Sequence, residues 1–205
     1  MALPLAMVRY VLSQKGAVIN FNSGPHTSAL NVKGAKADLI NKIMYNYYPC
    51  STHLDFKGIT FTGVPDSSPQ ANAANVAYEA DWATLGLVDA PGYIFTDSMS
   101  GCAFYLYRGF GDSVAGVHAS RQSGKLMDPT PYFQARASKP LYVWDSLGKL
   151  TGPMQGCFGA VLCCVDLDTI HIHVLALKGR SLEAVLERSR IDNWRTATNP
   201  VVQPL

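Results

Sequence analysis

The sequence has no long hydrophobic run. Across its 205 residues, no apolar stretch approaches the roughly 18 residues that indicate a membrane-spanning helix. The first seven residues, MALPLAM, also lack the basic segment and the long apolar segment of a secretory signal peptide. We therefore expect neither a membrane partner nor export through an N-terminal signal, while delivery by a route that reads no such signal stays open.

A large excess of charge is also missing. The chain carries 17 Lys and Arg against 15 Asp and Glu, a net charge of +2. That balance is too small to indicate a nucleic acid or an anionic membrane as a partner. Cysteine is scarce: there are five, an odd number, and Cys163 and Cys164 are adjacent, which argues against a disulfide framework. We therefore expect the protein to work in a reducing compartment.

What the sequence does contain is typical of a compact folded domain. Hydrophobic residues make up 48% of the chain and charged residues 16%, which excludes a disordered chain. Neither an internal repeat nor a low-complexity tract divides it. A chain of this length buries a sizeable core as one unit. We therefore expect a single domain over residues 1–205.

Strand patterns outnumber helix patterns about eight to three. Apolar or alternating runs that favour strands include residues 59–64, 93–96, 102–107, 114–119, 141–144, 158–165 and 169–177. Helix patterns cover residues 34–48 and 182–190, where apolar residues recur at helical spacing, and the alanine-rich residues 70–85. The predicted fold class is α+β, with a β-sandwich or mixed-sheet core and flanking helices.

The most informative stretch is FTDSMSGC, residues 95–102, which His118 follows sixteen positions after Cys102. A thiol beside an imidazole is the minimum apparatus for nucleophilic catalysis. Residues 102–107 and 114–119 read as two strands joined by a glycine-punctuated turn. If this hairpin is symmetric about Phe110, Cys102 and His118 face each other directly, with Cβ atoms about 4.5–5.5 Å apart. A slip of one residue would send the two side chains to opposite faces.

The spacing of these residues resembles that of the Cys–His glutamine deamidases. Thr96 lies six positions before Cys102, Ser100 and Gly101 lie directly before it, and His118 follows. The family includes Burkholderia lethal factor, the catalytic domain of cytotoxic necrotizing factor and, more distantly, the chemoreceptor deamidase CheD. The resemblance covers residues 95–119, roughly an eighth of the chain. Met99 stands where the toxins usually have leucine, a change that conserves volume.

The resemblance implies a role for each matching residue. Cys102 would be the nucleophile and His118 the general base, in a single catalytic domain. The backbone carbonyl of Thr96 would orient the imidazole, so its side chain would be dispensable; Asp97 is the alternative. The turn formed by Ser100 and Gly101 would present backbone N–H groups, those of Gly101 and Cys102, to the oxyanion.

The resemblance also implies an activity and a setting. The reaction would convert a protein glutamine to glutamate and ammonia, with no metal or organic cofactor. The protein would be a bacterial toxin or effector in the cytosol of a host cell, the bacterial cytoplasm being the alternative. Rho-type GTPases, a translation initiation helicase and chemoreceptors are the candidate partners. The polar segment 120–139, which we predict to be a long loop, follows His118, so we expect it to influence the choice of target.

Other interpretations stay open. The same Cys–His pair would serve a transglutaminase or a thiol hydrolase, and Cys102 would be a structural residue in a non-catalytic binding module. His171 and His173 lie on one face of a strand at a spacing seen in metal sites. Because no third ligand is evident, we expect a strand with one solvated face instead. Cys50 and His53 form a weaker second Cys–His pair, without a turn suited to an oxyanion.

Overall fold

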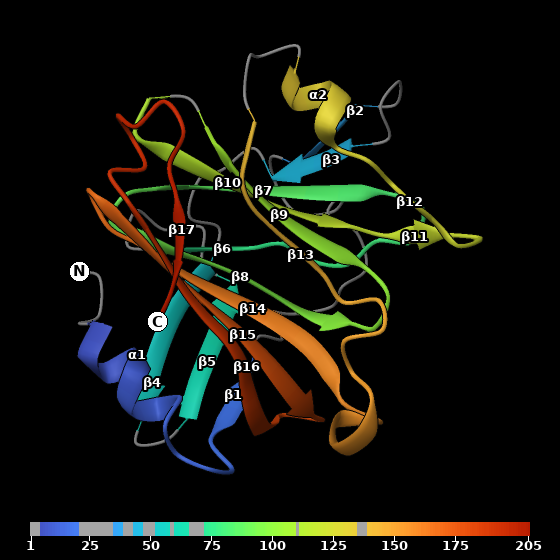
Figure 1. Ribbon diagram of the computed structural model, residues 1–205, viewed down its shortest axis with the longest axis vertical. Helices are drawn as coiled ribbons and strands as arrows, with labels where there is room; N and C mark the ends of the chain where they lie inside the picture. The colour runs from blue at the N-terminus through green and yellow to red at the C-terminus, as the bar shows by residue number, and fades with distance from the viewer. Residues whose placement is uncertain are drawn as a thin grey trace.

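The computed structural model describes residues 5–20, 35–38, 43–46, 52–57, 60–65, 72–109, 111–134 and 139–205. Two large β-sheets pack face to face and helices are few, so the predicted α+β class with a sandwich or mixed-sheet core is confirmed (Figure 1). The two faces that meet are rich in apolar side chains, which is what holds two sheets together.

Among the described residues, the larger sheet contains nine strands: β1 (Val18–Asn20), β4 (Thr52–Lys57), β5 (Thr60–Pro65), β6 (Ala73–Asn75), β8 (Gly92–Met99), β14 (Phe158–Val165), β15 (Thr169–Lys178), β16 (Ser181–Asp192) and β17 (Val202–Pro204). Their order across the sheet is β1-β5-β4-β6-β8-β14-β15-β16-β17. β1 also pairs with β16, through Val18 and Ser181. The sheet therefore curls until its first strand meets its eighth.

The smaller sheet has six strands in the described part of the chain: β2 (Ala35–Asp38), β3 (Ile43–Asn46), β7 (Ala83–Asp89), β9 (Ala103–Arg108), β10 (Ser113–Ala119) and β13 (Pro140–Asp145). Their order is β13-β9-β10-β7-β3-β2. The remaining elements are the short strands β11 (Arg121–Gln122) and β12 (Lys125–Leu126), the helices α1 (Leu5–Val11) and α2 (Thr130–Gln134), and a 3-10 turn, Gly152–Met154. Of the helices described, none is both long and apolar enough to cross a membrane.

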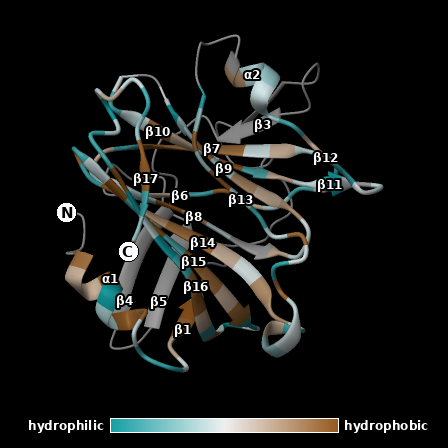
Figure 2. Ribbon diagram, viewed as in Figure 1, coloured by the Kyte–Doolittle hydropathy of each residue, from teal (hydrophilic) through white to brown (hydrophobic). Residues whose placement is uncertain are grey.

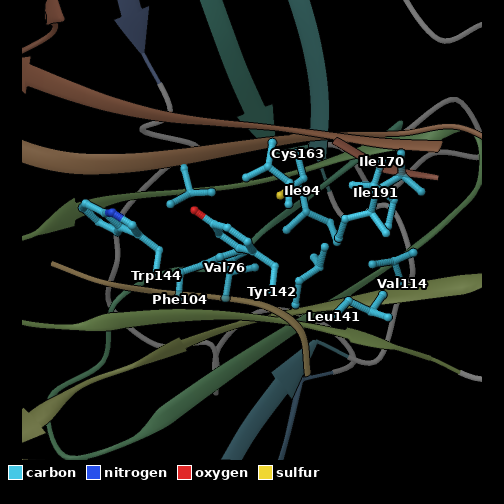
Figure 3. Packing of buried hydrophobic residues seen from close by; sticks show 14 of the residues in the cluster. Val76, Ile94, Phe104, Val114, Leu141, Tyr142, Trp144, Cys163, Ile170 and Ile191 are labelled. Atoms are coloured by element: carbon cyan, nitrogen blue, oxygen red, sulfur yellow. The ribbon is translucent and has the colours of Figure 1, made fainter. Parts of the chain in front are cut away.

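The main core lies between the two sheets. Figure 3 shows Ile94 and Cys163 of the larger sheet packed toward Phe104 of the smaller one. The strands of both layers are coloured mostly hydrophobic in Figure 2, and hydrophilic colour gathers at connecting segments such as the β11–β12 turn. Burial of these side chains supplies the main driving force for closing the sandwich.

The prediction of a helix over residues 182–190 is wrong, because these residues belong to β16. The pairing of β16 with β15 shifts twice, so that Leu186 and Glu183 are extra residues in the ladder. Each extra residue changes the spacing between equivalent positions from two to three. That irregularity gives β16 the apolar spacing of a helix.

The other two predicted helices are also absent from the described residues. Residues 35–38 and 43–46 are the paired strands β2 and β3, and the rest of 34–48 lies outside the described residues. Within 70–85, Ala73 and Ala74 belong to β6 and are fully buried. Alanine is used here because it is small enough for tight packing between layers, not because it favours a helix. The polar segment 120–139, expected to be a loop, contains β11, β12 and α2.

The two sheets lie close together around Gly116 of β10. A Cβ atom built at this position would lie 2.5 Å from Cγ2 of Ile94 in β8, and 3.2 Å from side-chain atoms of both Phe104 and Val76. Gly86 of β7 pairs with Gly116 in the ladder and is nearly as crowded. The absence of side chains at these two positions therefore allows the layers to lie close together here.

We predict that Gly116→Ala destabilises the protein by about 1–3 kcal/mol, because the added methyl overpacks the sheet interface. The measurement is the free energy of unfolding from urea denaturation. Gly148→Ala is the control: its Cβ would meet nothing within 4 Å. Because Gly148 has a φ of +71°, the control carries only the conformational cost of an L-residue in that region. Equal stability of Gly116→Ala and the wild type would contradict the prediction.

A second core fills the curl of the larger sheet and contains α1. His171 and His173 of β15 lie beside it, opposite Arg190 and Arg188 of β16. The expectation of a solvated strand face is wrong here: His173 is only 1% exposed, and neither of its ring nitrogens makes a hydrogen bond in the described part of the chain. Burial, together with the smaller effects of the nearby His171, Arg188 and Arg9, lowers the pKa of His173 from 6.5 to about 4. The described residues hold no group of three or more potential ligands able to bind a metal ion.

This histidine predicts a loss of stability in mild acid. The folded state binds the proton of His173 only near pH 4, whereas the unfolded chain binds it near pH 6.5. The part of the folding stability that depends on neutral His173 is therefore fully present above about pH 6.5. It is lost as the pH falls toward 4, by at most about 3 kcal/mol. Urea denaturation at several pH values measures it. His173→Leu should remove this part of the pH dependence, and an unchanged profile in that variant would exclude His173 as its source.

Candidate active site

The three residues of the sequence motif lie between the sheets. Thr96 is in β8 of the larger sheet, His118 is in β10 of the smaller sheet, and Cys102 directly precedes β9. Thr96 and His118 are fully buried, and Cys102 is 7% exposed. These residues come from different layers of the sandwich, so only packing of the two sheets brings them together.

The predicted register of the hairpin is wrong by two residues. His118 pairs with Phe104 rather than Cys102, because the turn is centred on Gly111 and not on Phe110. Gly111 has a φ of +59°, a conformation that glycine adopts without strain and phenylalanine does not. A shift of two residues in the β9–β10 register keeps the side chains of His118 and Cys102 on the same face of the sheet. They are therefore diagonal neighbours, whose Cα atoms are typically about 7–8 Å apart, instead of a directly opposed pair.

A hydrogen bond across the sandwich orients His118. The hydroxyl of Thr96 lies 2.6 Å from the carbonyl oxygen of Val76 and 2.7 Å from Nδ1 of His118. The hydroxyl has one proton, which it donates to the carbonyl, so it accepts a hydrogen bond from Nδ1–H. This arrangement selects the tautomer with the proton on Nδ1 and leaves Nε2 as the basic nitrogen.

The orienting group is thus the side chain of Thr96, and not its backbone carbonyl as the resemblance implied. The side chain of Asp97, the alternative, lies outside the described residues. The hydroxyl also satisfies a buried carbonyl, so its removal would leave two buried polar groups without this partner.

The turn before Cys102 is fixed by Ser146. Its hydroxyl accepts a hydrogen bond from the Gly101 N–H at 2.8 Å and donates one to the Cys102 carbonyl at 2.7 Å. The Gly101 N–H is therefore already used, which contradicts its predicted role as an oxyanion donor. The Ser100 N–H donates instead toward the thiol of Cys102. The turn thus directs donors at the sulfur, where they favour a thiolate.

Arg121 holds the other side of this turn. Its Nε–H donates to the Gly101 carbonyl at 2.7 Å, and its Nη2 forms an ion pair with Asp145 at 2.7 Å. Burial raises the pKa of the Cys102 thiol, whereas the backbone N–H groups of Ser100 and Arg121 and then the Arg121 guanidinium lower it. The carboxylate of Asp145 raises it slightly. Burial is the largest of these effects, so the thiol is protonated at neutral pH.

Three polar residues that sequence reasoning missed surround the motif. The ring of Tyr78, which is 40% exposed, lies 5.5 Å from the His118 ring. Burial, and after it the thiol of Cys102, raises the pKa of the Tyr78 phenol. Ser120 and Thr84 are buried, and their hydroxyls have no hydrogen-bond partner among the described residues. Nothing in the local sequence marks them: Tyr78 and Thr84 fall in the segment predicted as a helix, and Ser120 in the segment predicted as a loop.

The site therefore holds the protonated thiol of Cys102, the oriented imidazole of His118 and the guanidinium of Arg121. The partly exposed phenol of Tyr78 lies at its border. A neutral imidazole with a basic Nε2 is suited to accept the thiol proton, and the resulting thiolate is the reactive form of cysteine. Cys50 and the side chain of His53, the second Cys–His pair considered, lie outside the described residues.

Comparisons with known proteins add no relative to this picture. No protein-family model matches the chain, and no curated protein or solved structure matches it either.

We predict that Thr96→Val destabilises the protein by about 1–3 kcal/mol and randomises the His118 tautomer, because two buried hydrogen bonds are lost. Thr96→Ser, which keeps the hydroxyl, should retain the Nδ1–H tautomer. Imidazole ¹⁵N chemical shifts report the tautomer, and urea denaturation reports the stability. A valine variant that keeps the wild-type ¹⁵N shifts would show that another group orients the ring.

Proposed function

We propose that this protein is a glutamine deamidase that acts on another protein. The observation that carries the proposal is the position of Cys102 and His118 on one inner face of the β9–β10 ladder, with His118 oriented by the hydroxyl of Thr96. The resemblance of residues 95–119 to the Cys–His deamidases supports the same chemistry. By that resemblance the protein is a bacterial toxin or effector, and its target is a host protein such as a Rho-type GTPase or a translation initiation helicase.

The reaction begins with a proton transfer from Cys102 to Nε2 of His118. The thiolate attacks the carbonyl carbon of the glutamine side chain and forms a tetrahedral oxyanion. Collapse of this intermediate breaks the C–N bond, and the imidazolium gives its proton to the departing ammonia. His118 then accepts a proton from water, which attacks the thioester, so glutamate forms and the thiol is restored.

Each surrounding group supports one step of this sequence. Because burial raises the pKa of the thiol, the thiolate needs the amide donors of Ser100 and Arg121 and the positive charge of Arg121. The proton that leaves the sulfur must cross to a diagonal neighbour, and catalytic hydrogen bonds of this kind tighten when a substrate is bound. Tyr78, exposed at the border of the site, would contact the incoming glutamine segment.

The proposal predicts a mass gain of about one dalton for each glutamine converted, because an amide becomes an acid. Candidate target proteins are incubated with the wild type, and their intact masses are measured. Cys102→Ser and His118→Asn should abolish the gain. Cys164→Ala, which alters a thiol in the second core, should retain it.

Three results would contradict the proposal. Incorporation of an amine instead of water indicates a transglutaminase, and cleavage of the target indicates a thiol protease. Activity on a target that Cys102→Ser leaves intact indicates a structural cysteine in a binding module.

A further inference from the structure

In the observed register, Ser120 lies closer than His118 to the level of Cys102, the position that the predicted register gave to His118. The β9–β10 pairing ends at Ala119 and Ala103, and Ser120 and Cys102 are the next residues along the two segments. Ser120 is held on its β7 side, where its N–H donates to the Trp82 carbonyl at 3.1 Å, directly before β7. Ser120 therefore lies on the same inner face as His118 and Cys102.

The hydroxyl of Ser120 is buried without a partner. The residue is 1% exposed, and its Oγ makes no hydrogen bond within the described part of the chain. Its backbone is fully used: the N–H donates to Trp82, and the carbonyl accepts from Met127 at 2.8 Å. A buried polar group in this state costs free energy, so its presence requires an explanation.

The thiol of Cys102 provides that explanation. Side chains at neighbouring positions on one face of a ladder lie within about 8 Å of each other, so a change of rotamer at Ser120 can bring Oγ toward the sulfur. The next residue, Arg121, already donates its backbone N–H to this sulfur. A neutral thiol is a weak acceptor and does not engage the hydroxyl, whereas a thiolate is a strong one.

We propose that Ser120 is a positioning residue of the thiol site, whose hydroxyl donates a hydrogen bond to the Cys102 sulfur when the thiolate forms. With the N–H groups of Ser100 and Arg121, it completes three donors around the sulfur. The inference rests on the proposed function in taking Cys102 as the reacting group. It assigns these donors to the nucleophile, not to the oxyanion of the substrate.

The test measures the pKa of the Cys102 thiol in the full chain, from the pH dependence of its alkylation by iodoacetamide, followed by mass mapping. Loss of a hydrogen bond to a charged group should raise the thiol pKa by about one unit in Ser120→Ala and slow alkylation at pH 7 about tenfold. Thr84→Val is the matched control, because it removes another unpartnered buried hydroxyl, which lies opposite His118. It should leave the thiol pKa unchanged.

A second pair of variants covers a failure of Ser120→Ala to fold. Ser120→Thr and Ser120→Val have the same shape and differ only in the hydroxyl, so the threonine variant should have the lower thiol pKa. Equal pKa values across these variants, or an equal rise in Thr84→Val, would overturn the inference.

Deamidation of a target protein is followed in parallel to separate the two proposals. A thiol pKa that depends on Ser120, without deamidation by the wild type, would remove the proposed function and keep the inference. Deamidation by the wild type, together with a thiol pKa that does not depend on Ser120, would keep the proposed function and remove the inference about Ser120.

Discussion

The hydrogen bond between Thr96 and His118 links the two layers of the molecule at the candidate site. It crosses from β8 to β10, and it forms because the sheets approach closely where Gly116 and Gly86 have no side chains. The threonine hydroxyl donates to the Val76 carbonyl, so the same contact fixes the tautomer of the histidine. Packing of the two sheets therefore also orients the imidazole of His118 and fixes its tautomer.

Opposing effects set the pKa of the Cys102 thiol. Burial next to the sandwich core disfavours a charged sulfur, which explains why the pKa of Cys102 is raised. The peptide groups that lie against it and the Arg121 guanidinium act in the other direction. Ser146 and Arg121 hold the turn that presents these groups, through hydrogen bonds to the backbone of Gly101. A reactive cysteine in this position needs several donors, because no single one offsets its burial.

Sequence reasoning found the site residues but not their arrangement. Alternation of side chains along two adjacent strands correctly placed Cys102 and His118 on one face, since a shift of two residues preserves the face. The error came from the turn, where a glycine with positive φ moved the centre by one residue. The helix predicted over 182–190 failed for a related reason, because two extra residues in β16 break the alternation that identifies a strand.

The sequence by itself determined the sheet-dominated fold class, most of the strands from β8 onward, and the presence of a Cys–His pair on a hairpin. These features depend on local patterns of apolar and polar residues, which a single segment carries. The tertiary structure alone decided that a hydroxyl from β8 orients His118, that the ring of Tyr78 lies near the His118 ring, and that the Ser120 side chain is buried. Those relations join residues from different strands and different sheets, and the distances between them are set only when the two layers pack.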